Sequence, residues 1–311
     1  MIDFRYHLVS IVSIFLALAV GIVLGAGPLK EDLGNTLTSE VKNLRTDKAA
    51  LRTELDQADK AATARDEFTA ASNRTLLPGR LADTTISVVV LPGADQDSVK
   101  ATTDALVLAG GKIGSTITVQ DKWIDPDQAT FRSTLGQQLA GQVGVPVDQG
   151  GADVLGQVLA RSVLTKAGAN SNGAEAALGT MRTGDLIKFS DGVVPSSVAV
   201  VVAGPVGGTN EQTRTTQAEA LSALAGALDQ AGAGAVLVSD SGPAAASTTS
   251  VVTTARADEE LSKNLSTVDD VDLPMGQASV VFGLLEQEAG KAGQYGLDPD
   301  ATAAFPQLAT K

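Results

Sequence analysis

The sequence contains no cysteine and one histidine, His7. Disulfides, thiol catalysis and cysteine-ligated metals are therefore excluded, and a Ser-His-Asp triad has no histidine outside the extreme N-terminus. Aromatic residues make up only 3% of the chain, whereas hydrophobic residues make up 43%. The core must therefore be built from valine, leucine, isoleucine and alanine. Ser-Lys and paired-carboxylate mechanisms remain open, but no constellation of side chains points to them, so we expect a protein that is not an enzyme and binds no cofactor.

The chain is also short of positive charge. Its net charge is −13, and residues 76–311 carry 26 acidic and 14 basic side chains, a net of −12. Such a surface repels the phosphate backbone, so nucleic acid is excluded as a partner. The acidity favours solubility or a basic partner.

Residues 8–26, LVSIVSIFLALAVGIVLGA, form an uncharged run of 19 residues. About 20 apolar residues cross a bilayer as a helix, whereas the apolar part of a signal peptide spans roughly 7–15 residues. We therefore predict an uncleaved, single-pass anchor in contact with membrane lipid. The flanking positive charges do not decide its orientation. Because a seven-residue tail is easily retained, we expect residues 1–7 in the cytoplasm and the main domain outside the cytoplasmic membrane, in a periplasm-like space.

Small residues recur every fourth position along this run, at Ala17, Gly21 and Gly25. Such a face lets two membrane helices approach closely. The same spacing also arises by chance in helices rich in alanine and glycine, so alone it leaves dimerisation open.

Residues 31–75 have a heptad pattern that is typical of a coiled coil. The d positions are Leu37, Leu44, Leu51 and Ala58, and the a positions are Val41, Lys48, Leu55 and Ala62. Lys48 is the one polar residue in this seam, and such a residue limits oligomeric state and fixes register. A long helix that packs on its own domain is the alternative. The small-residue face of the preceding helix favours a parallel homodimer.

Residues 80–311 alternate between strand-like and helix-like segments. Predicted strands cover 85–91, 112–119, 186–189 (at an edge), 197–203 and 235–239, and predicted helices cover 98–110, 128–142, 153–165, 174–181, 212–230 and 274–290. Apolar strands alternating with helices predict an α/β fold, a mostly parallel, Rossmann-like sheet with helices on both faces. The similar units that begin at Thr85 and Ser197 suggest two related halves.

In such folds ligands bind beyond the carboxyl ends of the strands. One loop there is rich in glycine, with Gly204, Gly207 and Gly208, and another contains Asp240 and Ser241. The first precedes a predicted helix and is a candidate anion cradle, although it matches no phosphate-binding motif. Tight turns explain the glycines equally well.

Two further features have ordinary explanations. Asp269, Asp270 and Asp272 offer oxygen ligands for a hard cation, but their spacing is wrong for an EF-hand. Helix capping ahead of Pro274, or simple solvation, is the preferred interpretation, so no metal site is predicted. Trp123 is expected to pack in the core or at its rim.

The N-terminal stretch FRYHLVSIVSIFLALAVGIVLGAGPL and the later stretch STVDDVDLPMGQASVVFGLLEQ resemble the actinobacterial copper transporter MctB family. The resemblance covers essentially the whole chain, and Arg5, His7, Ser10 and residues 16–21 are its most specific part. It implies an envelope protein that lowers cellular copper and acts as an outer-membrane channel. For the SteB-like branch it implies instead a partner of the membrane protein SteA that controls a peptidoglycan hydrolase in cell separation.

The residues themselves weigh against copper coordination. Cu(I) prefers thiolate or thioether ligands and Cu(II) prefers imidazole, yet the soluble domain offers only Met181 and Met275, 94 positions apart. Short apolar strands between helices also differ from the strands of a membrane channel wall. We therefore expect an envelope scaffold that dimerises and binds protein partners. A component of copper efflux and a small-ligand binding domain are the alternatives.

Overall fold

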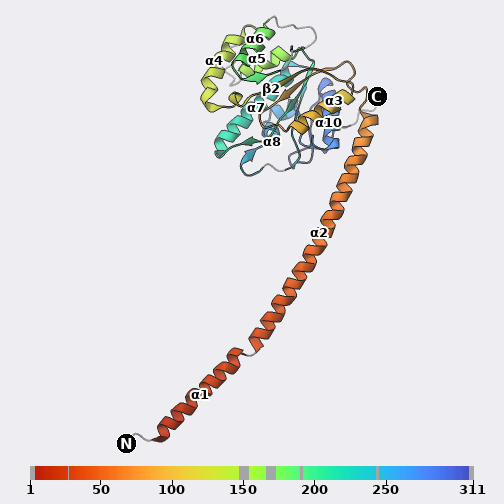
Figure 1. The fold of residues 1–311 in the computed structure, drawn as a ribbon. Coiled ribbons are helices and arrows are strands. Elements are labelled where there is room, and N and C mark those ends of the chain that lie inside the picture. The colour runs from red at the N-terminus through yellow and green to blue at the C-terminus, as the bar shows by residue number, and fades with distance from the viewer. Residues whose placement is uncertain are drawn as a thin grey trace. The chain divides into compact units, whose positions relative to one another are not determined.

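The computed structural model describes residues 4–26, 28–146, 154–165, 173–189, 192–242 and 245–307, with backbone only at 26 and 28–36. By internal contacts the chain divides into two units, Met1–Arg65 and Asp66–Lys311. The first unit contains two helices. The second contains the α/β domain together with the last turns of the second helix (Figure 1).

Helix α1 spans Phe4–Ala26. Its segment Phe4–Gly25 has a mean hydropathy of 2.8 over its most apolar window and buries none of its residues within the chain, so by length and composition it can cross a membrane. The helix begins four residues before the apolar run, because Phe4 to His7 continue it. The predicted tail is therefore helical from Phe4 onward.

Helix α2 spans the 49 residues Pro28–Leu76. Pro28 stands at its first position, where the missing N–H costs nothing, and Pro78 follows its end. Its last turns are part of the α/β domain: Asn73 is 6% exposed and donates from Nδ2 to the carbonyl of Pro274 at 2.7 Å. The domain therefore begins near residue 66, inside the segment predicted as coiled coil.

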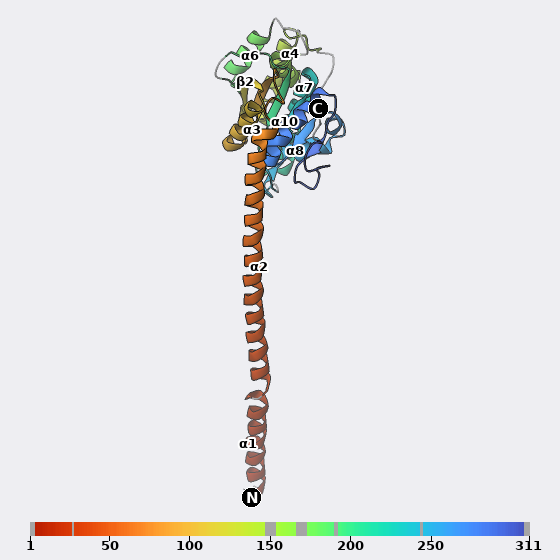
Figure 2. The ribbon, with the colours of Figure 1, turned by 90° about the vertical axis from the view of Figure 1, so that its right-hand side faces the viewer.

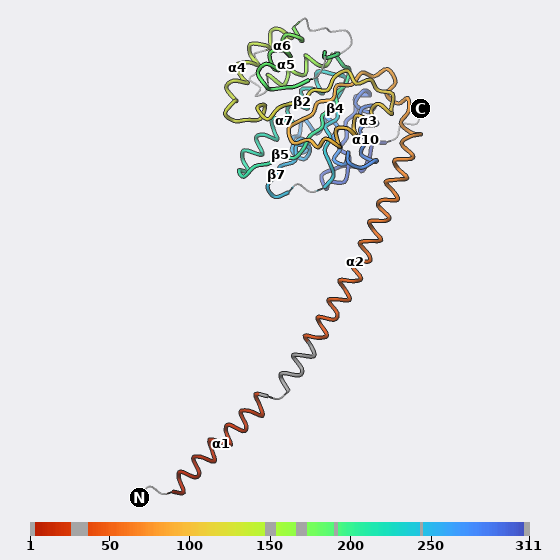
Figure 3. Tube along the Cα trace, in the orientation of Figure 1, coloured from red at the N-terminus to blue at the C-terminus, as the bar shows by residue number. Residues whose placement is uncertain are grey.

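The main sheet has seven strands in the order β3-β2-β1-β4-β6-β8-β9. Figure 3 labels two of them, β2 and β4, on the chain trace. All neighbours pair in parallel except the edge strand β3, which is antiparallel to β2. The strands are β1 Thr85–Val90, β2 Lys112–Val119, β3 Ile187–Lys188, β4 Val198–Val202, β6 Ala235–Val238, β8 Ser266–Val268 and β9 Gln294–Tyr295. A separate antiparallel pair joins β5 (Val206–Gly207) to β7 (Thr248–Thr249).

Helices cover both faces of this sheet (Figure 2). One face packs on α3 (Gln96–Leu108) and α10 (Pro274–Glu288). The other packs on α4 (Ala129–Ala140), α5 (Val154–Val163), α6 (Ala174–Thr183), α7 (Glu211–Ala231), α8 (Val251–Ala257) and α9 (Leu261–Asn264). Two 3₁₀ turns, η1 (Asp121–Trp123) and η2 (Pro126–Gln128), connect β2 to α4.

The central strands supply both cores. Val88 and Val90 of β1 pack into the α3/α10 side, whereas Val89 packs into the opposite side. Successive side chains of a strand point to opposite faces, so a continuous valine run is what a sheet covered on both faces requires. The predicted mostly parallel α/β sheet is confirmed.

The two predicted units do begin on neighbouring strands, β1 and β4, and wind in opposite directions from them. They are unequal. The first goes from β1 through α3 to β2 and meets the antiparallel β3, whereas the second continues from β4 and β6 to β8 and β9. The reversal between β1 and β4 is the topological switch point, where open α/β sheets bind ligands.

Candidate functional site

The loops that leave β1 and β4 meet at this switch point in direct backbone contact. A Cβ atom on Gly204 would overlap the backbone of Gly93, and one on Gly93 would come within 3.0 Å of the carbonyl oxygen of Pro205. Gly93 also has a φ of +80°, which side chains disfavour. Gly204 therefore serves close packing of two loops, and no ligand has room between them.

A buried arginine hydrogen-bonds to the rest of the glycine-rich loop. Arg214 is 7% exposed and donates from Nη1 to the carbonyl of Gly208 at 2.6 Å, while its buried Nε has no partner among the described residues. The side chain of Asn210 caps α7 by accepting from the amide of Thr213 at 3.0 Å. The first turn of α7 thus takes its capping acceptor from the chain itself.

A cavity of about 520 Å³ opens beside this loop, and Gly207 is part of its lining. Lys122 is its only basic residue, and Asp121 and Asp125 stand beside it. The lysine ammonium donates to the carbonyl of Gly184 at 2.9 Å. Two carboxylates against one engaged cation make this cavity unsuited to an anion.

Asp240 and Ser241 form hydrogen bonds with residues outside the glycine-rich loop. The carboxylate of Asp240 accepts a hydrogen bond from Ser98 Oγ on α3, and its pKa is raised by burial and by the nearby Asp272 and Asp95. Ser241 donates to Asp272 twice, from its amide at 2.6 Å and from Oγ at 2.7 Å. The five residues predicted for a ligand loop do not form one site.

The three aspartates after β8 also separate, and the expectation of capping or solvation is wrong for two of them. Asp269 and Asp270 are 0% exposed, and the N-cap of α10 is Leu273, with no side-chain cap. Among the residues that the structure describes, neither carboxylate oxygen of Asp270 has a hydrogen-bond partner. Burial, followed by the charges of Asp269 and Asp272, raises the pKa of Asp270 to about 7.

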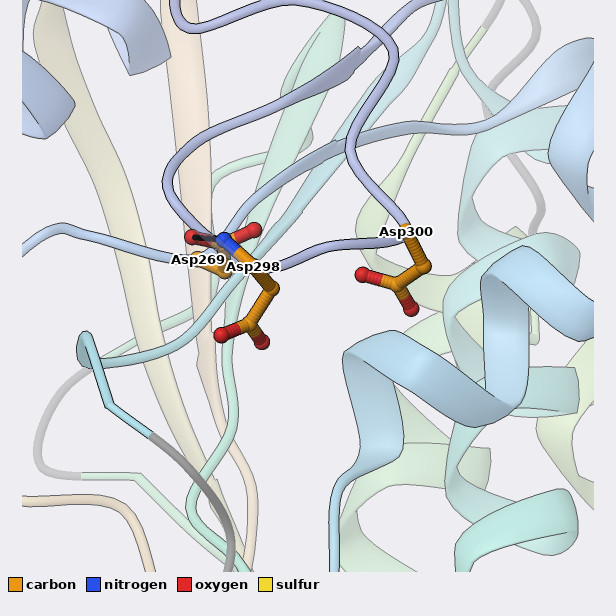
Figure 4. A group of neighbouring side chains, drawn as sticks. All are labelled: Asp269, Asp298 and Asp300. Carbon is orange, nitrogen blue, oxygen red and sulfur yellow. Dashed lines mark hydrogen bonds between the residues drawn. The ribbon is translucent and has the colours of Figure 1, made fainter.

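Asp269 belongs to a different cluster, with Asp298 and Asp300 (Figure 4). One ligand oxygen from each lies within 4.8 Å of the others, which is a plausible spacing for a cation. An arginine already occupies the cluster, however: Arg256 Nη1 donates to Asp269 at 2.7 Å and to Asp300 at 2.6 Å. The amides of Leu297 and Asp298 donate to the other oxygen of Asp269. The cluster is an arginine clasp rather than a metal site.

The soft donors that copper would need are not brought together. Met181 belongs to α6 and is fully buried in the core. Met275 lies in the first turn of α10, on the other side of the sheet. His7 is on α1. The residues that the structure describes therefore contain no thioether or imidazole cluster for copper as a substrate.

The predicted dimer seam is exposed along α2. Exposed fractions are 63% for Leu37, 39% for Val41, 66% for Leu44, 65% for Leu51 and 60% for Leu55. Lys48, Ala58 and Ala62 on the same seam are exposed as well. On α1, Ala17, Gly21 and Gly25 are exposed, and nothing lies within 4 Å of a Cβ built on either glycine. Apolar side chains in this number are normally covered by a partner.

Sequence reasoning missed Arg214, Arg256, Asp298 and Asp300. Arg256 and Asp300 are 44 positions apart in the chain, whereas Arg214 and Gly208 are only six apart. No local sequence pattern marks either contact. One signal was present: the arginine in ARADEE is the only basic residue between 215 and 262, so an acidic cluster in that part of the fold had one nearby counter-ion.

The fold and these sites define a class of protein: an α/β domain behind a long helix and an apolar N-terminal helix, with no soft-metal site among the described residues. The family described as "Copper transport outer membrane protein, MctB" matches residues 1–306, and the chain belongs to this family. The copper transporter MctB of Mycobacterium tuberculosis (strain ATCC 25618 / H37Rv) is 28% identical over 312 residues, covering 95% of this chain and 96% of its own. That of Mycobacterium leprae (strain TN) is 29% identical over 322 residues, with 97% and 98% covered. The resemblance noted in the sequence is confirmed.

Proposed function

We propose that this chain is a membrane-anchored, non-enzymatic scaffold of the cell envelope, which forms a parallel dimer through α2 and binds protein partners. The observation that carries the proposal is the exposed seam from Leu37 to Leu55. Heptad-spaced leucines on a helix this long gain free energy only when a second helix covers them.

The coiled coil contains the segment proposed to meet partners, because helices with charged flanks dock other helices. By resemblance to the SteB-like branch, those partners are a SteA-like membrane protein and a peptidoglycan hydrolase, and the process is cell separation. The domain then acts through its surfaces. This fits a switch point at which the loops after β1 and β4 pack directly against each other at Gly93 and Gly204.

A role in copper homeostasis is the second candidate, favoured by the relatives named copper transporter MctB. The scattered positions of Met181 and Met275 argue that such a role would run through a partner rather than through copper ligands of this chain. Titration of the full chain with Cu(I) tests this point. Sub-micromolar binding would overturn the scaffold proposal in favour of direct copper handling.

Cysteine cross-linking tests the dimer directly, because the chain has no cysteine of its own. In a parallel dimer the d positions face each other, so Leu44→Cys should oxidise to a disulfide across Cα atoms about 6 Å apart. Thr46→Cys, at the outward-facing f position, is the matched control. Equal cross-linking at both positions, or none at Leu44→Cys, would rule out this dimer.

Deletion of the gene then separates the two physiological roles. Cell chaining and copper sensitivity are scored in the same strain and after complementation with a Leu44→Lys/Leu51→Lys variant. Chaining that the variant does not rescue supports the scaffold in cell separation. Copper sensitivity without chaining supports the copper role.

For topology we propose that residues 1–7 lie in the cytoplasm and the α/β domain lies outside it. A Thr180→Cys variant places a thiol on the exposed surface of α6. A membrane-impermeant maleimide should label it in intact cells, and labelling only after lysis would reverse the orientation.

A further inference from the structure

A groove of about 840 Å³ lies on the α/β domain and is lined by residues of α7 and α8, two helices that contact each other. Trp123 of η1 lines it, together with residues of α7 and α8, and Leu261 of α9 also lines it. Its volume is in the range of small-molecule sites. The glycine-rich loop, the arginine clasp and the α2 seam contribute nothing to its lining, so its role is separate from theirs.

The groove contains a buried donor that the protein leaves unused. Trp123 is 2% exposed, and its indole N–H makes no hydrogen bond with the described residues. The indole nitrogen is also not one of the fully buried atoms that lack a partner, so solvent reaches it. A buried indole N–H normally finds a partner, so this one is available to a ligand in the groove.

The lining of the groove also contains threonine hydroxyl groups that the protein does not use. Thr216 of α7, Thr249 of β7 and Thr253 of α8 line the groove, and their hydroxyls make no hydrogen bond within the described chain. The carboxylate of Glu219 adds an acceptor without an ion-pair partner. Ala220 and Ala223 of α7 add apolar methyl groups to the same lining.

The charge of the groove excludes an anion. Its only basic residue is Arg132, and that guanidinium donates to the carbonyls of Lys122 at 3.2 Å and of Asp125 at 2.5 Å. Glu219 and Asp258 make the lining net negative. Neutral hydroxyl donors and acceptors remain as the recognition elements.

We propose that this groove binds a neutral, polyhydroxylated ligand, a short oligosaccharide. Sugar hydroxyls both donate and accept, which suits an array of threonine hydroxyls, one carboxylate and one indole N–H. The apolar C–H face of a pyranose suits the alanine methyl groups of the lining. The proposal does not depend on dimerisation or on copper.

Trp123 is the only tryptophan in the chain, so its fluorescence reports on this groove alone. The full-length protein in detergent is titrated with chitotriose and with maltotriose, and at least one should change the emission saturably, with half-saturation below roughly 1 mM. Spermidine and inorganic phosphate are the charged comparison probes. No change with either sugar up to about 10 mM, or a change with spermidine alone, would overturn the proposal.

Variants tie the signal to the groove. Thr216→Val and Thr253→Val keep the shape but remove a hydroxyl, and each should weaken sugar binding about 2- to 10-fold, the effect of one lost hydrogen bond. Ala220→Arg should abolish sugar binding because the long side chain occupies the groove. Thr180→Val, on the exposed surface of α6, should leave sugar binding unchanged. Thermal unfolding of each variant checks that it is folded. Sugar affinities unaffected by all three groove variants would also refute the site.

Discussion

Arg256 and Asp269 form an ion pair that is sealed from solvent. Nη1 and Oδ2 are 2.7 Å apart, and the two side chains are 3% and 0% exposed. The same guanidinium donates to Thr267 Oγ1, to the carbonyl of Tyr295 and to Asp300. One arginine on α8 thereby fixes the C-terminal segment against β8.

Replacing this arginine should strongly destabilise the domain. Arg256→Met removes the counter-charge but leaves Asp269 buried, and breaking a buried pair in this way costs about 3–5 kcal/mol. Urea unfolding of the variant and the parent protein measures the difference.

An exposed pair supplies the matched control. Lys263 and Glu259 lie 2.6 Å apart on the surface, with side chains 66% and 88% exposed. Lys263→Met should change the free energy of unfolding by no more than about 0.5 kcal/mol, since water screens such pairs. Similar losses in both variants would show that the clasp does not owe its effect to burial.

Asp270 should make stability fall as pH rises. Its pKa in the folded protein is about 7, above the ordinary value of 3.8, so the folded state holds the proton more tightly than the unfolded chain. Its contribution is fully present below about pH 4 and is lost as pH rises to about 7, up to about 4 kcal/mol in total. Asp270→Asn removes this dependence and should be the more stable protein at pH 8.

Urea unfolding between pH 4 and pH 8 measures the two slopes. Asp185→Asn is the matched control, because Asp185 is exposed and its φ of +58° is one that asparagine accepts. The control should keep the slope of the parent. Parallel pH curves for the parent and Asp270→Asn would contradict a raised pKa at this carboxyl.

The strands that the sequence predicted best are those buried on both faces. Strand β2 has the predicted bounds, β1 and β6 differ by one residue at one end, and β4 differs by one residue at each end. Segments rich in β-branched residues favour strands, which explains this agreement. Strands β5, β7, β8 and β9 were missed. They have two or three residues each, and pairing with neighbours, rather than local pattern, makes them strands.

The sites divide in the same way. The apolar a and d positions of α2 repeat every seven residues, so the sequence alone is enough to predict the seam. The surroundings of Asp269 and Asp270 cannot be predicted in this way, because these adjacent carboxylates differ only in the residues that the fold places beside them. Asp269 pairs with Arg256, 13 positions earlier, whereas the carboxylate of Asp270 has no hydrogen-bond partner within the described part of the chain.

Two glycines of the same loop should respond oppositely to alanine. Gly204→Ala would drive a methyl into the backbone of Gly93, whereas a Cβ on Gly207 has nothing within 4 Å. We expect Gly204→Ala to cost about 1–3 kcal/mol or more through overpacking and Gly207→Ala to cost little. Thermal unfolding compares them. Equal stability of the two variants would mean that the loops at β1 and β4 are not in contact.

The last prediction concerns Lys48, the polar a position of the proposed dimer. Lys48→Leu places a leucine in the seam and should stabilise the dimer by roughly 1–3 kcal/mol per chain, while removing the restraint on oligomeric state, so that higher oligomers form. Lys60→Leu adds the same side chain at an outward f position and should do neither. Light scattering and thermal unfolding of the detergent-solubilised proteins distinguish these outcomes. If both variants behave alike, Lys48 does not lie in a seam, and α2 is covered by something other than a second α2.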